Sequence, residues 1–146
     1  MLFFRAMHKT ATLREDFKIH AEASKLFELR ERLYRICTDE GIPPQSARLM
    51  VLAVDEAISN IVEHAKLPEN DNKIGVSVEI DEHQVVVRIS DRGKPFDPRP
   101  IRSEPDGRAY PRRGFGLYLI QKIVNQIDYE RTSDGSNLLK LTKSID

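Results

Sequence analysis

Two polar side chains four residues apart interrupt an apolar helical pattern, and their types could carry chemistry. Glu56 and Asn60 lie one turn apart on a predicted helix over residues 44–64, so their side chains point the same way. A carboxylate in this position can orient a hydroxyl group, and an amide oxygen can bind Mg²⁺. An isolated pair of this kind is also typical of a solvated helix surface, and the sequence leaves both interpretations open.

A second candidate lies at the end of a predicted strand. Apolar residues alternate along one face of residues 85–91, and Asp91 continues that face. Because a buried carboxylate without a partner is costly, Asp91 requires a donor on this side. The donor could be the backbone of the turn that follows, or an exocyclic amine of a ligand. Gly93 would let a ligand ring approach the backbone closely, and Pro95 and Phe96 would stiffen and cover the turn.

The third candidate is a glycine-containing start of a helix, Gly114-Phe115-Gly116-Leu117. Free backbone amides at a helix start form a ready anion site, although most isolated Gly-x-Gly sequences are simply turns. The preceding loop, residues 92–113, carries seven basic and three acidic side chains. This loop is either a mobile lid over phosphates or a solvated segment balanced by acidic residues elsewhere.

The elements that must position these residues follow from hydrophobic periodicity and turn signals. A strand is expected over residues 17–21, and Ser24 is expected to cap a helix that reaches about Glu40. Pro43 and Pro44 begin the helix that carries Glu56 and Asn60. The remaining elements are a hairpin of strands 73–80 and 85–91, a helix over 115–127, and a second hairpin of strands 129–132 and 137–143.

This order does not alternate one strand with one helix, which argues against a doubly wound parallel sheet. It favours an α+β two-layer sandwich, in which helices cover one face of a mixed, mainly antiparallel sheet. Residues 1–146 are expected to form a single domain, with residues 1–15 as a poorly ordered or accessory segment.

Composition limits the function further. Twenty-three basic and 23 acidic residues give zero formal net charge, which argues against direct nucleic-acid binding through bulk charge. No apolar run approaches the length of a membrane span, so no membrane association is expected. The one cysteine, Cys37, cannot form an internal disulfide or a zinc site. We therefore expect a cytoplasmic protein.

Taken in order, the three candidates resemble the nucleotide-binding boxes of a known superfamily. Residues 55–60 (DEAISN) resemble the N box of the gyrase, histidine-kinase and MutL (GHKL) ATPases. Residues 91–98 (DRGKPFDP) resemble the G1 box in the form typical of anti-sigma factor serine/threonine kinases. Residues 114–120 (GFGLYLI) resemble the G2 box, and residues 137–143 are similar to the last strand of that family. The likeness covers nearly the whole chain.

The resemblance implies a Bergerat-type fold that binds ATP with Mg²⁺. It implies that Glu56 is the general base, that Asn60 is the Mg²⁺ ligand, and that Asp91 accepts a hydrogen bond from the adenine amino group. Gly93 would lie beside the adenine ring. The expected nucleotide-binding set is Asn60, Asp91, Gly93, Pro95, Phe96, Arg113, Gly114, Phe115, Gly116 and Leu117, with backbone amides of Gly114 and Gly116 on the phosphates.

Three features depart from the family's pattern. The helix that carries Glu56 usually ends in His-Gly or His-Ala-Tyr, whereas here it ends in His64-Ala65-Lys66. The last strand of the family often follows a Gly-Thr pair whose hydroxyl helps to hold adenine, whereas this chain has Ser136 and Asn137. The residue before the Gly-x-Gly is commonly small, and here it is Arg113. None of these departures removes a group that the chemistry requires.

In functional terms, the resemblance implies a protein kinase that phosphorylates a STAS-domain anti-anti-sigma partner and sequesters a sigma factor. It also allows a homodimer. The alternative is an ATP-sensing partner-switch module that transfers no phosphate. Glu56 favours the kinase, because a pure binding module has no need of a base one helical turn from a metal ligand.

Overall fold

The structure is a computed structural model that describes residues 13–97 and 112–145, with the backbone alone for residues 112–115. Five strands form one sheet in the order β1-β2-β3-β5-β4, and every neighbouring pair is antiparallel. The strands are β1 (Leu13–His20), β2 (Lys73–Ile80), β3 (Gln84–Asp91), β4 (Gln126–Arg131) and β5 (Asn137–Ser144).

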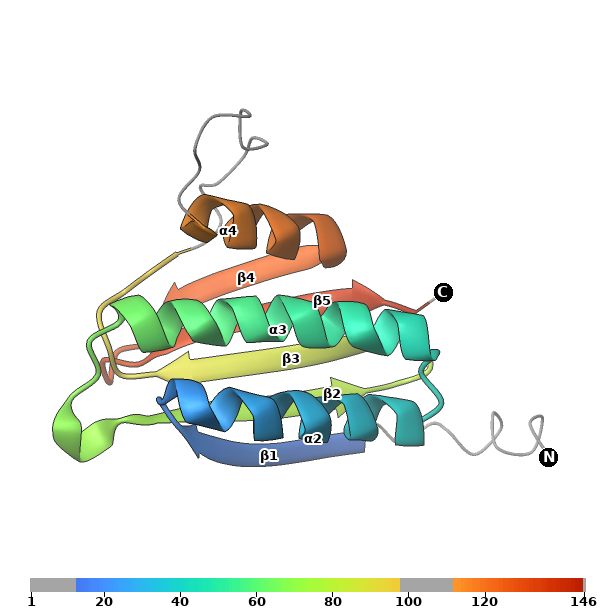
Figure 1. Ribbon diagram of the computed structural model, residues 1–146, viewed down its shortest axis with the longest axis horizontal. Coiled ribbons are helices and arrows are strands. Elements are labelled where there is room, and N and C mark those ends of the chain that lie inside the picture. Colours follow the sequence, from blue (N-terminus) through green and yellow to red (C-terminus); the bar gives the residue numbers. More distant parts are fainter. Residues whose placement is uncertain (1–12, 98–111, 146) are drawn as a thin grey trace.

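Three α-helices lie side by side on one face of this sheet (Figure 1). They are α2 (Leu26–Asp39), α3 (Pro44–His64) and α4 (Arg112–Ile123), with short 3₁₀ turns η1 (Ala23–Lys25) and η2 (Glu69–Asp71). The predicted α+β two-layer sandwich is therefore confirmed. The sheet is antiparallel throughout the described residues rather than mixed.

The core lies between the helical layer and the inner face of the sheet. Side chains alternate along β2 and β3, so that Val76, Val78, Val87 and Ile89 all point to the same side and are buried, whereas Val86 is buried on the opposite face. The apolar stripe expected along residues 47–65 packs against them: Ala47, Val54, Ile58, Ile61 and Ala65 are buried, and Val51 is partly buried. This packing fixes the side of α3 on which Glu56 and Asn60 lie.

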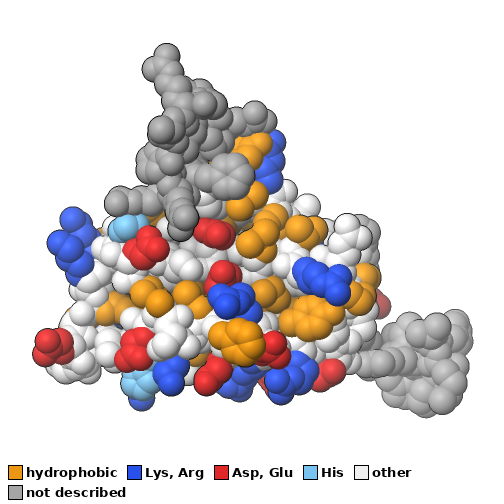
Figure 2. Space-filling model, viewed as in Figure 1, with side chains coloured by type: hydrophobic (Ala, Val, Ile, Leu, Met, Phe, Trp, Pro, Cys, Tyr) orange, Lys and Arg blue, Asp and Glu red, His pale blue; other side chains and the backbone are white. Residues whose placement is uncertain are grey.

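An ion pair fixes α3 against α2 next to the N-box residues. Arg30 Nη1 lies 3.1 Å from Asp55 Oδ1, and the aspartate is mostly buried while the arginine is partly exposed. The outer surface of the same two helices carries the large exposed apolar side chains of the described region, Phe27, Leu49 and Leu52. Figure 2 shows this face, where apolar and charged side chains are interspersed. No helix within residues 13–97 and 112–145 is long and apolar enough to cross a membrane.

Three expected boundaries are wrong. The first strand begins at Leu13, so residues 13–15 belong to the sheet rather than to an accessory segment. Ser24 does not cap α2, because it lies inside η1 and the helix that follows has no side-chain cap. The third helix spans 112–123 rather than 115–127, because Ile127 pairs with Leu141 in the sheet. A short apolar run does not distinguish helix from strand.

Lys66, just after α3, adopts a left-handed backbone conformation with φ of 49°. This conformation ends the helix in the way usually provided by glycine, and it is unfavourable for a residue with a Cβ atom. We expect Lys66→Gly to raise the free energy of unfolding by about 0.5–1 kcal/mol, measured by urea denaturation. Lys66→Ala is the matched control, because alanine keeps the Cβ atom. A gain in the alanine variant as large as in the glycine variant would show that backbone strain is not the cause.

Candidate functional site

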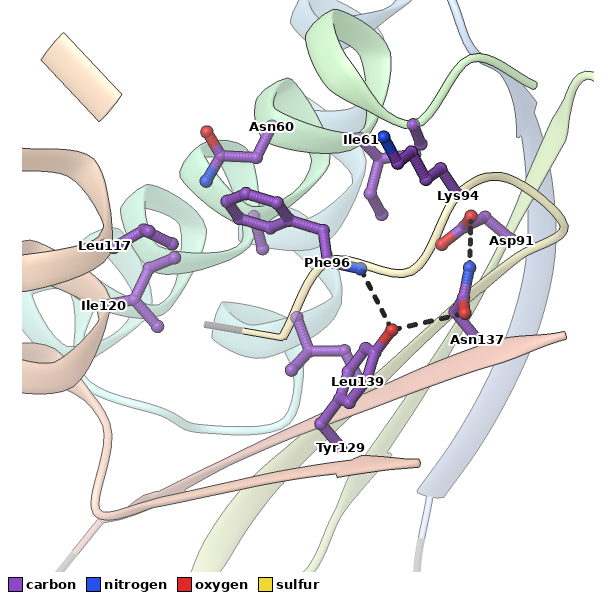
Figure 3. A pocket seen from close by; sticks show the side chains of 12 residues that line it. Asn60, Ile61, Asp91, Lys94, Phe96, Leu117, Ile120, Tyr129, Asn137 and Leu139 are labelled. Carbon is purple, nitrogen blue, oxygen red and sulfur yellow. Dashed lines mark hydrogen bonds between the residues drawn. The ribbon is translucent and has the colours of Figure 1, made fainter. Parts of the chain in front are cut away.

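A pocket opens between the C-terminal half of α3, the start of α4, the loop after β3 and the inner face of β4 and β5 (Figure 3). Four of the predicted nucleotide-binding residues line it together: Asn60, Asp91, Phe96 and Leu117. The other lining residues are Ala57, Ile61, Ala65, Lys94, Ile120, Tyr129, Asn137 and Leu139. The fold thus brings the N box, the G1 box and the G2 box to one place.

Asp91 lies at the bottom of the pocket and is only 7% exposed. Its Oδ1 atom accepts hydrogen bonds from the Gly93 backbone N–H at 2.8 Å and from Asn137 Nδ2 at 3.1 Å. Its Oδ2 atom receives no hydrogen bond from the described residues. The structure confirms that Asp91 caps the turn after β3 through Oδ1. Binding of a ligand amine at Oδ2 stays a prediction.

Asn137, which we did not predict as a site residue, is only 3% exposed and holds the centre of a buried polar network. Its Nδ2 atom also donates to the Gly93 carbonyl at 2.9 Å. Its Oδ1 atom accepts from Arg131 Nη1 at 2.8 Å and from the Tyr129 hydroxyl at 3.2 Å. The signal was present in the sequence, because Asn137 continues an inward-facing apolar alternation along its strand just as Asp91 does.

The Tyr129 hydroxyl extends this network to the G1 loop, because it accepts the Phe96 backbone N–H at 3.0 Å. Phe96 thereby has its ring inside the pocket, where Figure 3 shows it between Asn60 and Tyr129. The space that remains for the centre of a water molecule is about 20 Å³. This space is too small for an aromatic ring, so side chains that line the pocket, such as Phe96, would have to move to admit one.

A close backbone approach fastens the G1 loop to the end of α3. A Cβ atom on Gly93 would lie 2.5 Å from the Ala65 carbonyl oxygen and 2.7 Å from the Ala65 Cβ. The Lys94 backbone N–H donates to the same carbonyl at 2.6 Å. The absence of a side chain at Gly93 thus allows the G1 loop to pack against the end of α3. The sequence analysis explained this glycine by the close approach of a ligand ring instead.

Asn60 and Glu56 face the same region from α3. Asn60 is 7% exposed, and its Nδ2 atom is buried without a hydrogen-bond partner among the described residues. The surface interpretation of the pair is therefore wrong for Asn60. Burial raises the pKa of Glu56 above its ordinary value, and the negative charges of Asp55 and Glu63 raise it further. A carboxylate with a raised pKa is better suited to take a proton.

The start of α4 contacts Glu56 directly. The Oε2 atom of Glu56 lies so near Gly116 that a Cβ atom there would collide with it. Because α4 begins at Arg112, Gly116 is the fifth residue of the helix, and its amide is in position for an intrahelical bond. Gly114 is within the first four residues of the helix, where backbone amides have no intrahelical partner. A phosphate-facing role for Gly114 and Gly116 stays a prediction, and the structure adds a contact between Gly116 and Glu56.

Other predicted residues lie outside the pocket or outside the described part. Pro95 is exposed on the G1 loop and does not line the pocket. The side chains of Arg113 and Phe115 lie outside the described residues, and so do residues 98–111 of the expected lid. Arg92, which we counted in the basic lid, is ion-paired with Asp71 and Asp134 at 3.1 and 3.3 Å.

The chain matches a known family over most of its length: residues 19–143 match the family model described as the histidine kinase-like ATPase domain. The chain belongs to this family. It is 35% identical over 103 residues to the serine/threonine-protein kinase BtrW of Bordetella bronchiseptica, which covers 66% of this chain and 72% of that protein. It is 28% identical over 120 residues to the serine-protein kinase RsbW of Oceanobacillus iheyensis, which covers 77% of this chain and 75% of that protein. The resemblance to the anti-sigma factor kinases is thus confirmed.

Solved structures share the fold of this histidine kinase-like ATPase domain. A structure of the RsbU and RsbW domains of Rv1364c from Mycobacterium tuberculosis matches with a TM-score of 0.66 at 17% identity, over 90% of this chain and 32% of that one. The SiaB–SiaC complex from Pseudomonas aeruginosa matches with a TM-score of 0.58 at 18% identity, over 99% of this chain and 98% of that one. At these identities the likeness shows the fold alone.

The residues of this ATPase domain fit a nucleotide with its metal ion. Asn60 offers a buried amide: its Nδ2 atom, which has no partner among the described residues, can donate to a phosphate oxygen, and only its Oδ1 atom could bind a cation. Asp91 offers a carboxylate oxygen that the described residues leave free. A buried polar atom without a partner, such as Asn60 Nδ2, is rare in folded proteins unless a ligand or water binds it. Within the described residues no group of three or more His, Cys, Asp or Glu could hold a metal ion by itself. A metal at Asn60 would therefore need ligands from the nucleotide.

The contact between Gly93 and Ala65 predicts a measurable cost. We expect Gly93→Ala to lower the free energy of unfolding by about 1–3 kcal/mol, because the added methyl group would meet backbone atoms that cannot move aside. Urea denaturation measures this loss. Gly41→Ala is the control: Gly41 has open space around its Cβ position, and its φ of 88° limits the cost to backbone strain. Equal stability of Gly93→Ala and wild type would contradict the contact.

Proposed function

We propose that this chain is an Mg-ATP-dependent serine/threonine protein kinase that phosphorylates a STAS-type anti-anti-sigma protein and sequesters a sigma factor. The specificity for adenine is inferred from the hydrogen bonding of the two Asp91 carboxylate oxygens. One carboxylate oxygen is taken by the protein, and the other is left toward the pocket as a pure hydrogen-bond acceptor. Adenine carries an exocyclic amine that can donate to it, whereas guanine and hypoxanthine carry a carbonyl oxygen at the same ring position.

The remaining residues would divide the chemistry between binding and transfer. Asn60 would ligate Mg²⁺ through its amide oxygen, and the free amide of Gly114 would face the phosphates. Bound Mg-ATP supplies the phosphoryl group that is transferred. Glu56 would orient the serine or threonine hydroxyl of the partner and take its proton. The raised pKa of Glu56 and its place one turn from Asn60 support this role.

The partner assignment rests on relatives. Proteins named serine-protein kinase RsbW and serine/threonine-protein kinase BtrW match this chain over most of its length, and one structure with the same fold is a complex between two proteins, SiaB and SiaC. We infer a protein substrate of the STAS class, a sigma factor as the second partner, and action in the cytoplasm, where sigma factors work. The alternative, an ATP-sensing partner-switch module, keeps the same pocket and omits phosphate transfer.

The direct test is to incubate the protein with radiolabelled Mg-ATP and each STAS protein encoded in the same genome. Transfer of label to a serine or threonine of one of them supports the kinase. ATP binding without label transfer to any of them would replace the kinase with the partner-switch module.

Asp91→Asn separates base recognition from folding. The asparagine can keep its oxygen toward Gly93 and Asn137 and would then point its NH₂ group into the pocket. A donor would face the adenine amine, so we expect ATP binding to weaken by more than about tenfold, the loss typical of a hydrogen bond to a charged group. Calorimetry measures this change. Asp128→Asn, on the surface of β4, is the control, and unchanged affinity in Asp91→Asn would refute the adenine assignment.

Glu56→Gln separates catalysis from binding. We expect nucleotide affinity to stay nearly unchanged while phosphate transfer falls by about 10²–10⁴-fold, because the base is lost. In the wild type, the transfer rate should fall at low pH through a pKa above the ordinary glutamate value, because the pKa of Glu56 is raised. Glu63→Gln is the control: it keeps the base but removes one charge that raises the pKa of Glu56, so the fall should move to lower pH.

Glu56→Gln should also change the thermal stability of the protein. Because the folded protein raises the pKa of Glu56, the ionised carboxylate opposes folding at neutral pH. Thermal denaturation of Glu56→Gln should therefore give a higher Tm than wild type at pH 7.5. The difference should shrink as the pH falls below the ordinary glutamate pKa, where the group is protonated in both states. A lower Tm for Glu56→Gln at pH 7.5 would mean that the folded protein stabilises the ionised carboxylate, which would contradict the raised pKa.

A further inference from the structure

We propose that Asn137 is a positioning residue that sets the purine selectivity of the pocket by holding Asp91 in one orientation. This inference rests on the proposed function, because it assumes that the pocket takes an adenine nucleotide. It assigns to Asn137 a role without any contact to the base.

The first support is the register of the sheet. Asp91 and Asn137 are directly opposite each other in the β3–β5 ladder, and both side chains point to the helical side. Both are more than nine-tenths buried. Since directly opposed side chains of an antiparallel pair lie close together, this placement makes Asn137 the permanent neighbour of the carboxylate.

The second support is that the Asn137 side chain makes every hydrogen bond that it can. An asparagine amide has two donors and an oxygen with two lone pairs. The donors bind Asp91 Oδ1 and the Gly93 carbonyl, and the oxygen binds Arg131 and Tyr129. The opposite orientation would place the amide oxygen against a carboxylate and the NH₂ group against a guanidinium, which can only donate. The network therefore permits one orientation.

Asn137 would affect the bound base only indirectly, by fixing the carboxylate of Asp91. With Oδ1 bound by Asn137 and Gly93, the carboxylate cannot turn without breaking two hydrogen bonds. Oδ2 stays as a fixed acceptor at the pocket. A fixed acceptor discriminates against a base that presents a carbonyl oxygen, because the two oxygens repel and neither finds a donor. A saturated Asn137 also has no capacity left to bind the base itself, unlike the hydroxyl expected at this place in the family.

The test compares two ligands that differ at the relevant ring position, Mg-ATP and Mg-ITP, by calorimetry on the full chain. Wild type should bind ATP at least about tenfold more tightly than ITP, as one charge-assisted hydrogen bond allows. Asn137→Ala removes one of the two hydrogen bonds that hold the carboxylate and leaves only the Gly93 amide, so Asp91 is held less firmly and the ATP-over-ITP ratio should fall at least about fivefold. Asn125→Ala, which removes another side-chain hydrogen bond at the far end of the sheet, should leave the ratio unchanged.

A second variant tests the same network with a smaller change, in case Asn137→Ala does not fold. Tyr129→Phe removes the hydroxyl that binds Asn137 Oδ1 and the Phe96 amide but keeps the ring, so the ratio should fall about twofold to threefold. If Asn137→Ala does not fold, Tyr129→Phe decides alone.

The outcomes separate the two proposals. Equal weakening of ATP and ITP in the variants would overturn the role of Asn137, because a purely structural role lowers both affinities together. An unchanged ratio would overturn it as well, while ATP binding by the wild type leaves the proposed function standing. If wild type binds neither nucleotide, the proposed function itself fails.

Discussion

The site depends on the burial of one carboxylate. The apolar face of β3 ends in Asp91, which lies between the core and the pocket at 7% exposure. A charge in this place must be matched by donors, and the fold supplies them from the next turn and from the opposite strand. Asn137 in turn requires donors for its own oxygen, which Tyr129 and Arg131 provide. One buried charge thus organises the ends of β3, β4 and β5.

The helical layer is fitted to this arrangement by close contacts at small residues. The end of α3 is fastened to the G1 loop where Gly93 meets Ala65, and the start of α4 meets Glu56 at Gly116. A side chain at Gly93 would meet backbone atoms of Ala65, whereas a side chain at Gly116 would displace the carboxylate of Glu56. Lys66, in its left-handed conformation, follows directly after Ala65 at the end of α3. The close approach of Gly93 to Ala65, together with the hydrogen bond from the Lys94 backbone N–H to the Ala65 carbonyl, therefore sets the spacing between the end of α3 and the G1 loop.

The sequence predicted the individual groups better than their connections. The period of two along β3 identified Asp91 as inward-facing, and the helical period identified Glu56 and Asn60 as neighbours. Asn137 shows the same pattern in its own strand, but its importance comes from lying opposite Asp91, and sequence patterns do not specify that β3 pairs with β5. The boundaries of α4 failed for a related reason, since Ile127 satisfies either a helix or a strand until its partner Leu141 is known. Long-range pairing supplied what local patterns could not.

The central claim is that Asp91 presents a single oxygen to an adenine amine while Asn137 holds the other. The most direct measurement is a crystal structure of the protein with bound ADP and Mg²⁺. The account predicts the adenine amino nitrogen within hydrogen-bond distance of Asp91 Oδ2, with the Asn137 and Gly93 bonds to Oδ1 intact and the Phe96 ring moved from the pocket. A base bound elsewhere, or an Asp91 carboxylate turned away from Asn137 to receive the base, would contradict it.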